Sequence, residues 1–93
     1  MKRTSPQQLA SQLGISKSRA LEAVFKAKLL SAIIHVIEKR GITHVELAKR
    51  SGLPRSAVTG ILSGSLQKVT IDRILKLVEA AGLEADIKVH EVA

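Results

Sequence analysis

The sequence predicts an all-α fold with a short β-strand at its C-terminal end, and three observations support this class. Ninety-three residues are enough for one hydrophobic core but not for two. Good helix formers such as Leu, Ala, Lys and Glu dominate, whereas Gly, Ser and Pro fall mainly between segments with helical periodicity. Helix-capping patterns stand at the starts of these segments.

Two helices are expected in the first forty residues. The tetrapeptide Ser5-Pro6-Gln7-Gln8 is typical of a capped helix start, and Gly14 ends this first helix. Ser16 can cap a second helix, which runs to Arg40 because neither Gly nor Pro interrupts it, and Gly41 follows as a left-handed stop. Apolar residues cover more than one stripe of the second helix, so we expect it to pack on two sides.

Three further helices are expected over residues 43–52, 54–62 and 70–82. Thr43 and Glu46 form a capping box at the start of the first of them. Gly52 ends the helix over residues 43–52, and Gly82 ends the helix over residues 70–82. The apolar residues of the latter helix recur at intervals of three and four. In contrast, residues 85–90 alternate between apolar and polar types, which predicts a short half-buried strand. Such a strand requires a partner strand for its backbone groups.

The charge is uneven along the chain. Residues 1–28 carry six basic and one acidic side chain, and residues 39–76 carry eight basic and two acidic ones. Residues 77–93 carry one basic and four acidic side chains. The overall charge of +7 therefore belongs to a basic body followed by an acidic tail, a pattern that attracts polyanions.

Several classes of function are disfavoured. The chain has no cysteine, and no His, Asp or Glu cluster has ligand spacing, so we expect neither a metal nor a cofactor. No paired nucleophile and base and no phosphate-binding glycine loop is present, so we expect no enzyme. Phe25 is the sole aromatic residue, which argues against single-stranded RNA binding by stacking.

The same sequence favours a cytoplasmic protein with no membrane partner. The basic start has no apolar stretch behind it, so it does not resemble a signal peptide. The longest apolar run, residues 29–37, is broken by two polar residues. It is also much shorter than the roughly 20 residues that a membrane-spanning helix needs.

The segment "VELAKRSGLPRSAVTGIL" (residues 45–62) predicts two short helices that meet at a sharp corner. Ala48 allows the two helix backbones to approach, and Gly52 can adopt a positive φ at the corner. Four apolar side chains are spaced to lock the pair against the core: Leu47, Leu53, Val58 and Ile61. This spacing indicates a helix-turn-helix whose second helix has one buried face and one free face.

Together with "VTIDRILKLVEAAG", this segment resembles the lambda-repressor and Cro-like helix-turn-helix family of the xenobiotic-response-element type, over about residues 28–82. The leading "KAKLL" and the trailing "LEADIKV" resemble small single-domain HigA-like antitoxins and regulators. The resemblance implies a five-helix domain that binds operator DNA as a homodimer, with the second helix of the motif in the major groove. The expected organisation is an N-terminal helical arm (1–27), this domain (28–82), and a C-terminal strand and tail (83–93) for dimer or partner contact.

The resemblance also implies which residues contact DNA. The base readers of the family fall on Arg55, Ser56, Thr59 and Gly60. Arg55 can make a bidentate contact with guanine O6 and N7. Gly60 departs from the family pattern, because it offers no side chain where a reader usually stands.

The phosphate anchor of the family falls on His44 beside Thr43, at the start of a helix, where the dipole and the backbone amides favour an anion. Ser63, Ser65 and Lys68, in the loop after the second helix of the motif, are further expected phosphate contacts.

An internal repeat leaves a second interpretation open. "LASQLGISKS" (residues 9–18) matches "LAKRSGLPRS" (residues 47–56) at an offset of 38. We interpret residues 9–18 as part of an arm that packs on the domain or on a dimer mate, because the later apolar positions fall on the small residues Ala20 and Ala23. A second functional helix-turn-helix is the alternative.

Two functional hypotheses follow. The first is a sequence-specific DNA-binding transcriptional regulator, a dimeric repressor that binds double-stranded DNA through the helix starting near Pro54. The second is an antitoxin-type module that neutralises a toxin protein and autoregulates its operon. The acidic tail and the unpaired strand at residues 85–90 motivate the second hypothesis, because such a strand can add to the sheet edge of another protein.

Overall fold

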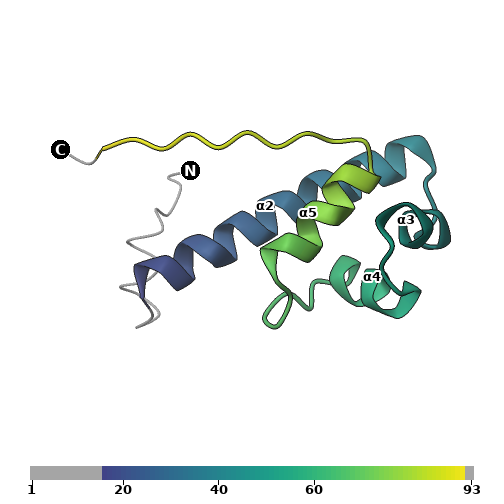
Figure 1. Cartoon of the computed structure of the whole chain (residues 1–93), viewed down its shortest axis with the longest axis horizontal. Coiled ribbons are helices and arrows are strands. Elements are labelled where there is room, and N and C mark those ends of the chain that lie inside the picture. The colour runs from purple at the N-terminus through teal and green to yellow at the C-terminus, as the bar shows by residue number, and fades with distance from the viewer. Residues whose placement is uncertain (1–15, 92–93) are drawn as a thin grey trace.

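The computed structural model describes residues 16–91, and this part of the chain is all-α (Figure 1). It contains four helices: α2 (Lys17–Arg40), α3 (His44–Ser51), α4 (Arg55–Leu62) and α5 (Ile71–Ala80). The all-α class is confirmed, but the predicted count of five helices is not reproduced in the described residues. The helix expected between Ser5 and Gly14 lies outside them, as does most of the repeat at residues 9–18.

Three of the helices start at the hydroxyl residues that the sequence predicts. Ser16, Thr43 and Thr70 each adopt an extended backbone and accept a hydrogen bond from the backbone N–H three residues later, at 3.1 to 3.2 Å. This geometry satisfies one of the amides that a helix start leaves free. The carboxylate of Glu46 pairs with Arg50 one turn further along α3, at 3.6 Å.

Two helices end at glycines with left-handed backbones. Gly41 (φ 66°) follows α2 and Gly52 (φ 75°) follows α3, and their N–H groups donate to the carbonyls of Ile37 and Ala48. Both stops were predicted, and glycine suits them because it has no Cβ to clash at positive φ.

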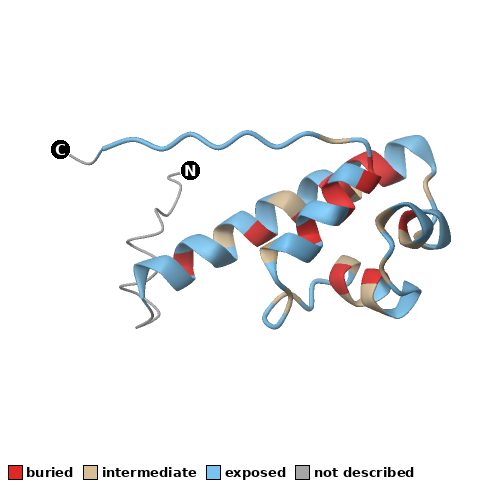
Figure 2. Ribbon diagram, viewed as in Figure 1, coloured by how far each residue is buried: buried red, intermediate tan, exposed pale blue. Residues whose placement is uncertain are grey.

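Each helix contributes to one core. The largest fully buried side chains are Ile33 of α2, Leu47 of α3, Val58 and Ile61 of α4, and Ile74 and Leu77 of α5. Figure 2 shows the buried residues on the inward faces of the helices. Burying an aliphatic side chain contributes about 1.5 to 3 kcal/mol. This core therefore fixes α3 and α4 against the long helix α2 and against α5.

The prediction of a C-terminal strand is wrong. Residues 83–91 have no regular structure, and residues 84–91 are all exposed. Ile87 is 79% exposed and Val89 is 90% exposed, so neither packs on the helices. The physical reason is the missing partner: no other strand lies in the described part of the chain, so the backbone groups of this segment are left to water.

The first half of α2 is less covered than the sequence predicts. Leu30 is its first residue in the shared core cluster. Ala20 and Lys26 are buried outside that cluster, whereas Leu21 and Phe25 are 40% and 41% exposed. Figure 1 shows this half extending past α5. The packing of this half on two sides therefore stays a prediction. The boundary between arm and domain, 27/28, falls within α2, and the division into arm and domain stays a prediction. None of the described helices is long and apolar enough to cross a bilayer.

Two glycine substitutions test the corner between α3 and α4. Gly52→Ala should lower the free energy of unfolding by about 1 to 2 kcal/mol, because an alanine is strained in the left-handed region. Gly60→Ala is the matched control, because Gly60 lies inside α4 with no atom within 4 Å of an added Cβ. It should raise the free energy of unfolding by about 0.5 to 1 kcal/mol. Urea denaturation measures both, and a stabilising effect of Gly52→Ala would contradict the corner geometry.

Candidate nucleic-acid interface

The corner between α3 and α4 is braced from within. Ser51 Oγ donates to the carbonyl of Ala48 at 3.3 Å and accepts from the N–H of Leu53 at 3.2 Å. Gly52 supplies the left-handed turn, and Pro54 is the N-cap residue of α4. The two helices therefore leave the corner in directions that local backbone geometry fixes.

The outer face of α4 carries the predicted base readers. Arg55, Ser56 and Thr59 are exposed and Gly60 is partly buried, whereas Val58 and Ile61 on the opposite face are buried in the core. Residues spaced by three and four share one side of a helix, so the four predicted readers form one surface. The structure thus brings them together.

The start of α4 favours a negative partner. The Pro54 cap offers no side-chain hydrogen bond, and no acidic residue lies in the first turn. The amides and dipole of a helix N-terminus attract anions. Arg55 adds a cation at this end. Among residues 16–91 the ion pairs involve Lys26, Arg50 and Lys76, so Arg55 and Lys68 pair with no acidic side chain of this range.

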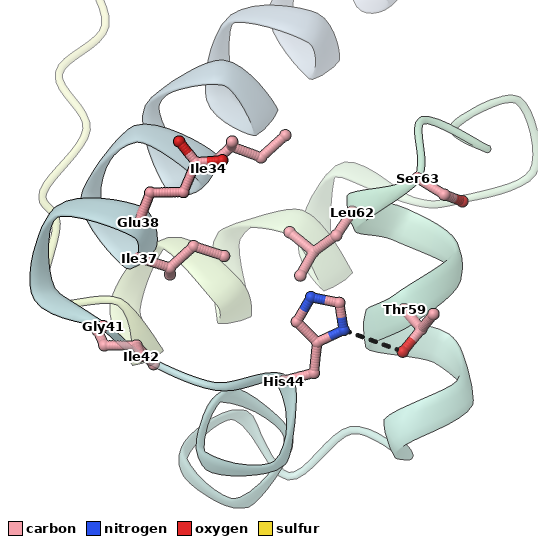
Figure 3. A pocket seen from close by; sticks show the side chains of 9 residues that line it. All are labelled: Ile34, Ile37, Glu38, Gly41, Ile42, His44, Thr59, Leu62 and Ser63. Carbon is pink, nitrogen blue, oxygen red and sulfur yellow. Dashed lines mark hydrogen bonds between the residues drawn. The ribbon is translucent and has the colours of Figure 1, made fainter.

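His44 and Thr59 are in direct contact, which sequence reasoning did not anticipate. His44 Nδ1 lies 3.2 Å from Thr59 Oγ1, a hydrogen bond that joins the start of α3 to the middle of α4 (Figure 3). The predicted phosphate anchor and a predicted base reader therefore form one unit. The sequence carries no signal for this contact, because the contact depends on how α3 and α4 cross.

The His44 ring lies in an open groove of about 660 Å³ between α2, α3 and α4 (Figure 3). The walls are mostly apolar, with the carboxylate of Glu38 and the hydroxyls of Thr59 and Ser63 as polar groups. Within residues 16–91, no group of three or more His, Cys, Asp or Glu is placed to hold a metal ion.

The remaining predicted phosphate residues lie on either side of α4 in the chain. Thr43 is exposed, and its hydroxyl caps α3. Ser63, Ser65 and Lys68 are exposed in the loop between α4 and α5. Ser63 Oγ donates to the carbonyl of Gly60 at 2.7 Å, so the loop begins as a continuation of α4.

The sequence did not predict one buried side chain that contacts this loop. Lys26 of α2 is buried, and its Nζ donates to the carbonyl of Leu66 at 3.2 Å. The spacing of Glu22 and Lys26 in the sequence is compatible with an ordinary surface pair on a helix. Neither the burial of the lysine nor its contact with a residue forty positions away has a signature in the sequence.

A tight corner between two short helices, the second of which has one buried and one exposed face, defines a helix-turn-helix protein. A sequence model of the helix-turn-helix domain family matches residues 13–90 of the chain, so the protein belongs to this DNA-binding family. Comparisons with curated proteins and with solved structures gave no match.

The contact between His44 and Thr59 can be tested by a double-mutant cycle on stability. His44→Phe and Thr59→Val each remove one side of the hydrogen bond and keep a similar shape. The free energies of unfolding should show a coupling of about 0.5 to 1 kcal/mol. Thr70→Val is the control, because its hydroxyl caps α5 and does not bond to His44. Coupling of the same size between His44→Phe and Thr70→Val would contradict a specific contact.

Proposed function

We propose that the protein is a sequence-specific DNA-binding transcriptional regulator of the lambda-repressor and Cro-like type, which binds operator DNA as a homodimer and represses. The observation that carries this proposal is that α4 has one buried face and one exposed face. Val58 and Ile61 are buried in the core, whereas Arg55, Ser56 and Thr59 are exposed on the opposite face. That face fits the major groove, which is wide enough for one helix.

Arg55 is the proposed principal base reader. Its guanidinium can donate two hydrogen bonds to guanine O6 and N7, a pairing that contributes about 1 to 3 kcal/mol of discrimination. Ser56 and Thr59 can donate to or accept from several bases, so they add less selectivity. The hydrogen bond to His44 restricts the rotamer of Thr59, which reduces the entropy lost when that side chain contacts a base.

Gly60 supports a close approach of α4 to DNA. A glycine inside a helix costs about 0.5 to 1 kcal/mol relative to alanine. In the described part of the chain, no atom beyond the neighbouring helix backbone lies within 4 Å of an added Cβ, so packing among these residues does not require a glycine here. An external surface that approaches the helix at this point accounts for it.

Contacts on both sides of α4 are proposed to hold the DNA backbone. Thr43 and His44 lie at the start of α3, and Ser63, Ser65 and Lys68 lie in the loop after α4. Each phosphate that a cation neutralises steepens the dependence of log affinity on log salt by about 0.9 for duplex DNA. A half-site held in this way is small, and a homodimer doubles it across two half-sites about 10 base pairs apart.

Selection of bound sequences from a random duplex pool tests this function, with affinities of the selected and scrambled sequences then measured across salt concentration. The proposal predicts a consensus with two related half-sites and an affinity for the selected sequence that exceeds that for scrambled DNA by about 10³-fold or more. Recovery of no consensus, with equal affinity for both duplexes, contradicts it.

Arg55→Ala should lower the affinity for the selected sequence by about 5- to 150-fold, which corresponds to about 1 to 3 kcal/mol. It should also relax the base preference at one position of each half-site. Lys76→Ala is the control with the same change in charge, because Lys76 lies on α5 and pairs with Asp72. Gel shifts on a panel of single-base variants measure both. Equal losses of affinity in the two variants would mean that Arg55 acts only through the overall electrostatic field of the protein.

A second candidate function is neutralisation of a toxin protein by an antitoxin-type module. The exposed segment at residues 83–91 favours it, because Ile87 and Val89 have no partner in the described part of the chain. An extended segment of this kind can add to a sheet edge. Co-expression with the product of an adjacent gene tests this candidate. A complex that the double variant Ile87→Ser and Val89→Ser abolishes supports it, whereas no complex contradicts it for that neighbour.

A further inference from the structure

Lys26 stands out because a lysine is rarely buried. It is 6% exposed, and no other charged residue in the described range is buried. Removing an ammonium group from water is costly unless it is paired and hydrogen-bonded. Lys26 has both kinds of partner: Glu22 Oε1 lies 2.9 Å from Nζ on the same helix, and the carbonyl of Leu66 lies 3.2 Å away.

The bond to Leu66 ties the long helix to the loop that follows α4. Leu66 lies in that loop, forty residues away in the chain. Its carbonyl also accepts from the N–H of Val69 at 3.2 Å, so one oxygen organises both the turn of the loop and its attachment to α2. Figure 1 shows this loop between α4 and α5, on the side toward the first half of α2.

Close packing does not hold this part of the loop to α2. A hollow of about 530 Å³ lies between them, lined by Arg19, Glu22, Ala23 and Lys26 of α2 and by Gly64, Leu66 and Gln67 of the loop. Leu66 is partly buried against the core, but residues 64, 65, 67 and 68 are exposed. Among residues 16–91, the hydrogen bond from Lys26 to Leu66 is therefore the direct polar attachment of this loop to α2.

We propose that Lys26 is a positioning residue for DNA binding, which holds the loop of Ser63, Ser65 and Lys68 in the geometry that contacts phosphates. This inference rests on the proposed function. The ammonium is buried and paired with Glu22, so it does not itself contact DNA. Its effect is to fix the loop beforehand, which reduces the ordering cost of binding.

Lys26→Met tests the proposal, because methionine keeps an unbranched apolar side chain in the buried site and removes the donor. Lys28→Met is the matched control, with the same change in charge at an exposed position of the same helix. Glu22→Gln is the second variant, because its amide oxygen can still accept from Lys26 and the bond to Leu66 remains. Helical circular dichroism checks that all three variants fold.

Hydrogen exchange of the free protein gives the first readout, which does not depend on DNA. In Lys26→Met, the amides of Ser65 and Val69, which donate to the carbonyls of Gly60 in α4 and of Leu66 in the loop, should exchange about tenfold faster. Core amides of α3 and α5 should change by less than about threefold, as should every amide in Lys28→Met. In Glu22→Gln, which keeps the bond to Leu66, Ser65 and Val69 should exchange more slowly than in Lys26→Met. Unchanged exchange of Ser65 and Val69 in Lys26→Met overturns the proposal.

A double-mutant cycle with Lys68→Ala on the selected DNA gives the second readout. The loss of affinity caused by Lys68→Ala should be at least about threefold smaller in the Lys26→Met background than in the wild type or in Lys28→Met. Additive losses overturn the proposal and leave the proposed function standing. Absence of specific binding by the wild type overturns the proposed function, and with it this role of Lys26.

Discussion

The structure depends on one backbone constraint, the left-handed turn at Gly52. The turn lets α3 and α4 leave the corner with Leu47, Val58 and Ile61 directed at a common core. Because those faces are buried, the opposite face of α4 is necessarily the outer one. The presentation of Arg55, Ser56 and Thr59 is thus a consequence of core packing around a fixed corner.

Elements governed by local chemistry could be predicted from the sequence. The caps at Ser16 and Thr43, the helix start at Thr70 and the stop at Gly41 depend on interactions within about four residues, so the pattern alone placed them correctly. The buried positions of the helix-turn-helix followed from helical periodicity. The shared outer face of the base readers followed from the same periodicity, although their contact with DNA stays a prediction.

Features that depend on distant parts of the chain could not be predicted in this way. Alternation at residues 85–90 favoured a strand, but a strand exists only with a partner, and residues 16–91 supply none. The contact between His44 and Thr59 arises from the crossing of two helices. The buried Lys26 is similar, because its partner Leu66 lies in a loop whose path depends on the whole fold.

The basic residues of the chain differ in how far the fold exposes them. The sequence counts Lys26 and Arg55 alike, yet Lys26 is buried against Glu22 whereas Arg55 is exposed at the unblocked start of α4. Long-range attraction of DNA depends on exposed charges, and a buried pair contributes to local structure instead. Among residues 16–91, the structure therefore separates the buried Lys26 from the exposed cations, which are the ones placed to attract a polyanion.

Mapping of the DNA contact by nuclear magnetic resonance tests the central claim most directly. Backbone amide shifts of the labelled protein would be followed during titration with the selected duplex. The account predicts that the largest shifts occur at residues 55–60, with further shifts at residues 43–44 and 63–68. Largest shifts on α5 and residues 83–91, with α4 unchanged, would contradict it.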